Sequence, residues 1–232
     1  MKCSKRYRAI QSKEKQDTYG IKGAIEFIRE CATAKFDETV ELIINLGIDP
    51  KKDHVRGTAL LPHGTGKTKR VLALAEGPKT KEAQEAGADF VGSDEYLKQI
   101  EGGWLEFDTI VATPDLMTKI SKLGKLLGPR GLMPNPKTGT LTMDIGKAIK
   151  EVKMGKVELK MDKTGGIHTS VGKMSFTTDK LHENICEVLK SVWSAKPTTV
   201  KAKNYLKTVH LSSTMGVGAK LDPKDVGEGI QK

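Results

Sequence analysis

The segment LPHGTGKTKRV at residues 61–71 contains the residue types from which proteins build phosphate-binding loops. Its centre, GTGKT at 64–68, is similar to the end of the loop GxxxxGK[ST], whose backbone amides surround the phosphates of a nucleotide. The first glycine of such a loop would fall at position 61, which is leucine, and a strand-like run follows at 71–75 where a helix should begin. We therefore expect a glycine-containing crossover loop here in place of a nucleotide site.

Other patterns that could support catalysis or cofactor binding are also incomplete. Gly216 and Gly218 lack the third glycine of a dinucleotide fingerprint, because position 221 is leucine. The three cysteines include no CxxC pair and the five histidines add no ligand spacing, so we expect no metal site and reduced thiols. No Ser-His-Asp set or carboxylate pair stands out in the sequence.

The composition favours an anionic partner. The 232 residues carry a net charge of +10, which attracts nucleic acid and other anions. Aromatic residues make up only 5% of the chain, which argues against a platform that stacks many bases and favours contacts with the RNA or DNA backbone. The first fifteen residues hold six Lys or Arg and one Glu, which fits either a solvated tail or an arm that contacts phosphate.

The hydropathy pattern gives no sign of a membrane protein. No run approaches 18 apolar residues, so no transmembrane helix is expected. The basic N-terminus is not followed by an apolar core and is therefore not a secretory signal. We expect a cytoplasmic protein with no membrane partner.

The two flanks of the sequence have the alternation typical of antiparallel sheets. Residues 40–46 alternate as a strand, and residues 156–176 predict a hairpin with its turn at 163–166. The remaining flank elements are expected to be amphipathic helices at 21–32 and 179–193, a strand at 55–62, and a strand and loop at 204–218.

The middle of the chain has a different pattern, because apolar runs alternate there with short helical segments. Residues 71–75 and 107–116 are typical of buried parallel strands, and short helices are expected after each strand, including one at 117–127. Such alternation predicts a small α/β layer. We therefore expect an α/β domain inserted into an α+β domain that is built from both ends of the chain.

Five segments carry a resemblance to one family. Their order and sequence are similar to those of the large-subunit ribosomal protein L-one family, bacterial type, and the pair LPHGTGKTKRV and LGPRGLMPNP is highly specific. The segments are AKFDETVEL at 34–42, RGTALLPHGTGKTKRV at 56–71, LGPRGLMPNPKTGT at 127–140, GKVELKMDKTGGIHTSVGKMSF at 155–176 and SSTMGVG at 212–218.

The resemblance implies an architecture of two domains. A Rossmann-like, three-layer α/β domain (67–156) would be inserted into a discontinuous α+β RNA-binding domain (1–66 and 157–232). The hinge between them would fall at Gly64, Gly66, Lys67 and Lys156.

The resemblance also implies a function without catalysis, metal or cofactor. The protein would bind large-subunit rRNA at the mobile stalk beside the tRNA exit site and would assist the release of deacylated E-site tRNA. It would also repress translation of its own operon by binding an rRNA-like site in the mRNA. We expect a monomer when it is free of the ribosome.

Carried over residue by residue, the family's RNA-binding positions fall on three parts of this chain. Short hydroxyls and exposed backbone suit RNA duplexes, whose shallow minor groove presents 2′-hydroxyls. Val217 departs from the family, which often has proline there, so the family pattern does not fix the contact of Gly218. The implied residues are Lys35, Phe36, Thr39, Glu41, Asp162, Lys163, His168, Ser213, Thr214, Met215, Gly216 and Gly218.

Several alternatives stay open from the residues alone. Phe36 also fits a core position, Glu41 fits a solvent-facing strand position, and the basic loop 121–140 fits either an RNA contact or a simple connection. A nucleotide-binding enzyme that uses Lys67 and Thr68 is a competing hypothesis, and so is a sequence-indifferent binder that uses the first fifteen residues.

Overall fold

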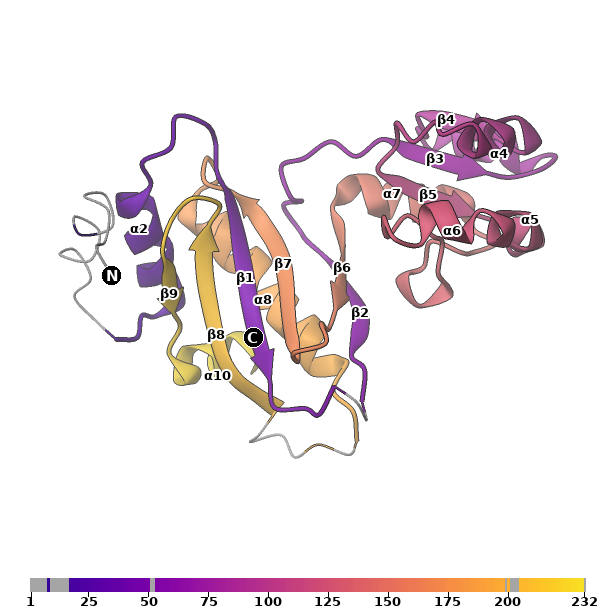
Figure 1. Cartoon of the computed structure of the whole chain (residues 1–232). Helices are drawn as coiled ribbons and strands as arrows, with labels where there is room; N and C mark the ends of the chain where they lie inside the picture. The colour runs from indigo at the N-terminus through magenta and orange to yellow at the C-terminus, as the bar shows by residue number, and fades with distance from the viewer. Residues whose placement is uncertain (1–7, 9–16, 51–52, 199, 201–204, 232) are drawn as a thin grey trace. The chain divides into compact units, whose positions relative to one another are not determined.

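The computed structural model describes residues 8, 17–50, 53–198, 200 and 205–231, so the basic run at 1–15 lies outside the described residues except for Arg8. The chain divides into two compact units. One is made of Met1–Gly66 and Val157–Lys232 and is called the terminal unit below; the other, Lys67–Lys156, is called the middle unit. Figure 1 shows the elements of both units.

The terminal unit is built on a four-stranded antiparallel sheet. Its order is β7-β1-β8-β9, so the strand near the N-terminus lies between strands from the C-terminal third. The elements of this sheet and its helices are α2 (Ile21–Cys31), β1 (Thr39–Leu46), β7 (Gly166–Lys173), α8 (Thr178–Ser194), β8 (Leu206–Ser213), β9 (Gly218–Lys220) and α10 (Pro223–Gln231).

The strands of this sheet bury one face and expose the other. In β1, Leu42 and Ile44 are fully buried, whereas Glu41 and Asn45 are exposed, as period-two alternation requires. The helices α2, α8 and α10 share one apolar core with the buried face, and Figure 1 shows α8 behind β1 and β7. The face that carries Glu41 and Asn45 is called the outer face below.

The hairpin expected at 156–176 is only partly formed. The turn is present, because Asp162 N–H donates to the Gly166 carbonyl over 2.8 Å. The two arms then diverge: β6 (Lys156–Lys160) pairs with β2 (Arg56–Leu60) in a separate two-stranded sheet, while β7 pairs with β1. The prediction was wrong about the partner because alternation specifies which face a strand buries and leaves its neighbour open.

The middle unit contains a three-stranded parallel sheet of order β4-β3-β5. The central strand is buried on both faces, with Leu72 and Leu74 in one core and Val71 and Ala73 in another. The elements in chain order are β3 (Val71–Leu74), α3 (Lys79–Glu85), β4 (Phe90–Gly92), α4 (Asp94–Glu101), β5 (Thr109–Ala112), η1 (Pro114–Leu116), α5 (Met117–Lys122), α6 (Gly124–Leu127), η2 (Pro136–Thr138) and α7 (Ile145–Met154).

Among the elements that the structure describes, the helices α7 and α10, the strand β9 and the short helices η1 and η2 were missed from the sequence. The stripe Ile145, Ala148, Ile149 and Val152 on α7 is buried, and its spacing is that of an amphipathic helix, so the signal was present. The helix expected at 117–127 is divided into α5 and α6 at Leu123.

The chain is a mixed α/β protein, with a parallel sheet in the middle unit and an antiparallel sheet that uses segments from both flanks. None of the described helices has the length and apolar character that crossing a membrane would need.

Candidate nucleic-acid interface

The implied RNA-binding residues fall at the two ends of β1 and on the outer face between them. Thr39 begins β1 and pairs with Lys173, whereas Asn45, near its other end, pairs with Gly166. Seven residue steps separate Thr39 from Leu46, so the two ends lie about 24 Å apart at roughly 3.4 Å per residue. The implied residues therefore form two clusters, one at each end of β1, and the polar side chains of the outer face lie between the clusters. Two members of the first cluster, Thr39 and Ser213, are themselves buried.

The first cluster is organised by the turn Ser213–Gly216, which follows β8. The N–H of Gly216 donates to the Ser213 carbonyl over 3.1 Å and closes the turn. Thr214 is held against Thr39 by a reciprocal pair of hydrogen bonds: Thr39 N–H donates to Thr214 Oγ1 over 3.0 Å, and Thr214 N–H donates to the Thr39 carbonyl over 3.1 Å. The start of β1 thus fixes the turn, and the side chains of Thr214 and Met215 remain exposed.

Ser213 and Gly216 of this turn pack closely against each other. Ser213 is only 4% exposed and points to the buried face, in step with Val209 and Leu211. Its Oγ lies directly beneath Gly216, so that a Cβ on Gly216 would collide with it. The same period-two alternation could have shown from the sequence that Ser213 faces inward.

Lys35 and Phe36 lie in the segment that leads into β1, and both are exposed. Phe36 is 56% exposed and Met215 50% exposed, which is high for large apolar side chains. Glu41, two residues into the strand, lies on the outer face beside Ser170 of β7 and Ser212 of β8. This end of the sheet therefore offers apolar surface, hydroxyls, backbone and a lysine in one area.

The second cluster is the turn between β6 and β7. Asp162, Lys163 and His168 are all exposed, and the Asp162 carboxylate lies 3.5 Å from His168 Nε2. The turn is attached to the end of β1, because Leu46 N–H donates to the Gly165 carbonyl over 2.9 Å. Lys163 consequently projects from a fixed turn at the far end of β1.

The outer face between the clusters carries polar residues that the resemblance did not point to. They alternate with buried residues along β1, β7, β8 and β9, so the alternation could have predicted that they face outward. Only the register of the strands shows that they lie side by side across the sheet. The polar residues of the outer face, called the strip below, are Asn45, Ser170, Thr208, His210, Ser212 and Lys220. Burial, and secondarily the Lys220 ammonium, lower the pKa of His210, so its imidazole is largely neutral at pH 7.

The implied hinge residues border the two connections between the units. Gly64 and Gly66 have positive φ angles of 65° and 71°, which glycine adopts without strain. The carbonyl of Lys156 accepts a hydrogen bond of 2.7 Å from Lys69 Nζ, and burial lowers the pKa of Lys69. Lys67 is exposed.

The segment 61–70 does not have the setting of a nucleotide-binding loop. It lies between β2 and β3, so no helix follows its lysine and threonine. Across the residues that the structure describes, no group of three or more His, Cys, Asp or Glu side chains could hold a metal ion.

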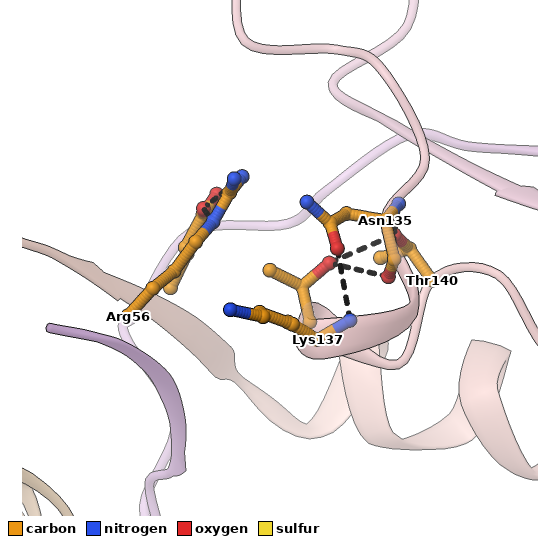
Figure 2. A network of polar contacts seen from close by, with 6 residues as sticks. Arg56, Asn135, Lys137 and Thr140 are labelled. Atoms are coloured by element: carbon orange, nitrogen blue, oxygen red, sulfur yellow. Dashed lines mark hydrogen bonds and ion pairs between the residues drawn. The ribbon is translucent and has the colours of Figure 1, made fainter. Parts of the chain in front are cut away.

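The loop 121–140 of the middle unit combines basic charge with an ordered end. Lys122, Lys125, Arg130 and Lys137 are exposed on it. Figure 2 shows Asn135 between Lys137 and Thr140. The Asn135 side-chain oxygen accepts from the Lys137 N–H over 2.9 Å, and the backbone N–H of Asn135 donates to Thr140 Oγ1 over 2.9 Å. The polar network gives this part of the loop a defined conformation.

Comparison with known proteins gives consistent results over nearly the whole chain. Residues 28–217 match the ribosomal protein L1p/L10e family. Three similar proteins, each named large ribosomal subunit protein uL1, come from Flavobacterium psychrophilum (51% identity, covering 96% of this chain and 97% of the relative), Protochlamydia amoebophila (51%, 96% and 95%) and Porphyromonas gingivalis (50%, 98% and 99%). A family match over residues 28–217 and relatives about 50% identical over nearly the whole chain show that the chain belongs to the ribosomal protein L1p/L10e family.

Proposed function

We propose that this protein is a non-catalytic component of the large ribosomal subunit in the cytoplasm, and that the terminal unit binds large-subunit rRNA at the mobile stalk beside the tRNA exit site. The observation that carries the proposal is the strip of exposed and partly exposed polar residues on the outer face, which ends at the Thr39–Thr214 junction. Family membership and the name of the three relatives support the ribosomal assignment.

The chemistry of the strip suits an RNA duplex. The N–H groups of Thr214, Met215 and Gly216 are bonded within the protein, so the turn presents its exposed side chains and backbone carbonyls. These carbonyls and the hydroxyls of Ser170, Thr208 and Ser212 can bind 2′-hydroxyls from the minor-groove side, where base edges are also accessible. Lys35 and Lys163 add positive charge at the two ends, and Met215 can pack against ribose. A rigid strip with short side chains fits recognition of shape better than stacking of unpaired bases.

We further propose that the two units are domains, with a Rossmann-like middle domain inserted through a hinge at Gly64, Gly66, Lys67 and Lys156. The exposed basic residues of loop 121–140 would contact the E-site tRNA and help to release it after deacylation. The same RNA-binding strip would bind an rRNA-like site in the mRNA of the protein's own operon and repress its translation. The free protein would be a monomer.

The primary experiment measures binding of the purified protein to two RNAs of matched length over a series of salt concentrations. One RNA carries the stalk region of large-subunit rRNA and the other is an unrelated hairpin. We expect a preference of about 100-fold that persists as salt rises, because shape recognition adds to the salt-dependent phosphate term. Equal affinities that decline together would contradict specific recognition.

Two sets of variants locate the surface. Thr214→Ala combined with Met215→Ala should weaken binding to the stalk RNA at least tenfold. Lys163→Ala should reduce the steepness of the salt dependence, which is the slope of the logarithm of the binding constant against the logarithm of the salt concentration. The expected reduction is about 1, as for one lost phosphate contact. Lys180→Ala is the matched control, because Lys180 is also exposed but lies on α8, over the buried face. Equal effects of the two lysine variants would contradict the assignment of Lys163.

A further inference from the structure

Glu38, immediately before β1, is a buried acidic residue. It is only 2% exposed, although its neighbours Phe36 and Asp37 are exposed. A carboxylate is rarely buried to this extent unless hydrogen-bond donors are directed at it. Its contacts therefore indicate what the buried carboxyl group stabilises.

One contact reaches the turn that carries Met215. The Glu38 carboxylate, through Oε2, accepts a hydrogen bond of 3.0 Å from the backbone N–H of Met215. A buried hydrogen bond is costly to leave unmade, because the backbone N–H would otherwise lose its partner away from water. Together with the Thr39–Thr214 pair, it fixes two consecutive backbone N–H groups of the 213–216 turn.

A second set of contacts ties the same segment to the connection between β7 and α8. The Glu38 carbonyl accepts from Met174 N–H over 2.9 Å. The Asp37 carboxylate accepts from Ser175 twice, from the N–H over 3.1 Å and from the hydroxyl over 2.8 Å. The segment 37–39 thus holds two loops that are far apart in sequence, and Glu38 contacts both of them.

We propose that Glu38 is a positioning residue for RNA recognition: its buried carboxylate fixes the backbone of Met215 and presents the Thr214–Gly216 turn in the conformation that receives RNA. This inference rests on the proposed function. Because Glu38 is buried while Thr214 and Met215 are exposed, it acts through the turn. A loop held in its bound conformation loses less conformational entropy on binding, and the affinity rises accordingly.

The carboxylate is tested with three substitutions at position 38. Glu38→Gln keeps an oxygen acceptor for Met215 N–H, whereas Glu38→Leu has a similar volume and no acceptor. Glu38→Asp keeps the charge but shortens the side chain by one methylene, and it serves where Glu38→Leu does not fold. We expect binding of the stalk RNA to fall at least tenfold in Glu38→Leu, by an intermediate factor in Glu38→Asp, and by less than threefold in Glu38→Gln.

Two controls separate positioning from general damage. The log–log salt slope should be unchanged in all three variants, because no phosphate contact is lost, whereas Lys163→Ala lowers it. Asp37→Asn changes the neighbouring carboxylate, which contacts Ser175 instead of the turn, and should leave RNA affinity within about threefold. A loss in Asp37→Asn as large as in Glu38→Leu would overturn the specific assignment to Glu38.

Hydrogen exchange supplies a readout that does not depend on RNA. The Met215 amide should exchange at least tenfold faster in Glu38→Leu or Glu38→Asp, while amides of the buried strand β1, such as that of Leu42, keep their protection. Unchanged exchange at Met215 overturns the inference, and so does wild-type RNA affinity in folded Glu38→Leu. Failure of the unmodified protein to prefer stalk RNA would instead overturn the proposed function, and Met215 exchange would still show whether Glu38 holds the turn.

Discussion

The side-chain amide of Asn184 donates a hydrogen bond of 3.0 Å to the carbonyl of Gly64. Asn184 lies on α8 and is fully buried, and Gly64 lies 120 residues earlier in the segment that resembles a phosphate-binding loop. The same amide donates to the Val171 carbonyl over 2.7 Å, and its oxygen accepts from His63 N–H over 3.2 Å. The loop is therefore held in place by an internal amide where a nucleotide-binding loop would be open to phosphate.

Asn184→Ala should reduce the free energy of unfolding of the terminal unit by about 3 kcal/mol, because three backbone groups lose their partner and each buried group left unsatisfied costs roughly 1–3 kcal/mol. Denaturant unfolding followed by circular dichroism measures the change. Asn45→Ala is the matched control: it removes an exposed hydrogen bond to Thr208 and should change stability by less than about 0.5 kcal/mol. Equal effects would contradict the role given to Asn184.

Gly216→Ala should destabilise the turn after β8 by about 1–3 kcal/mol, because the new Cβ would collide with Ser213 Oγ in a buried position. Gly218→Ala is the control two residues away, since nothing lies within 4 Å of a Cβ there. Thermal unfolding should show a lower Tm for Gly216→Ala and a nearly unchanged one for Gly218→Ala. A similar Tm for both variants would mean that the turn accommodates the side chain.

Ser213→Ala should be neutral or should stabilise the protein by up to about 1 kcal/mol. Within the described part of the chain, the buried Ser213 Oγ has no hydrogen-bond partner, so its removal relieves a desolvation cost. The double variant with Gly216→Ala should recover part of the stability that Gly216→Ala loses, because the colliding atom is gone. Chemical denaturation of the four proteins in this cycle tests the coupling, and strict additivity would rule out the contact.

Tyr205 should make the terminal unit sensitive to alkaline pH. Burial raises the pKa of Tyr205 to about 12, and its hydroxyl donates to the Val192 carbonyl over 2.8 Å. Because the folded pKa exceeds the unfolded value of about 10, the stabilisation is complete below pH 10 and is lost as pH rises through 12.

Tyr205→Phe should lower the free energy of unfolding at pH 8 by about 1 kcal/mol through the lost hydrogen bond. Between pH 10 and 12, the free energy of unfolding of this variant should decline less steeply than that of the unmodified protein. The measurement is urea unfolding at a series of pH values. Tyr19→Phe, in the same unit but only partly buried, is the control and should keep the steep decline. A decline in Tyr205→Phe as steep as in the unmodified protein would show that other groups cause it.

Asn135→Ala should reduce the local stability of the loop 121–140 by about 1 kcal/mol, because it removes the acceptor for the Lys137 N–H at the start of η2. Asn135→Asp retains an acceptor oxygen and should stay close to the unmodified protein. Hydrogen exchange of the Lys137 amide follows the change directly, and equal exchange in the two variants would contradict the capping role seen in Figure 2.

The sequence alone determined the strands and helices in which buried residues recur at a regular spacing. Alternation predicted β1 with Leu42 and Ile44 inward, and the continuous apolar run at 71–75 predicted a strand buried on both faces, because neighbours within one strand or helix fix these patterns. The motif segments were specific enough to indicate the family. The phosphate-loop resemblance was also rejected correctly as a local structure, since a strand follows it where a helix is required.

Only the tertiary structure decided which segments pair and which residues meet between them, because the spacing of residues within one segment does not carry this information. Register places Glu41 between Ser170 and Ser212, and strand choice sends β6 to β2 and away from β7. The burial of Glu38 depends on a backbone N–H 177 residues further along the chain, so its position before a strand could not reveal it. The candidate surface consists of contacts between distant segments, and their free energy depends on the whole sheet being assembled.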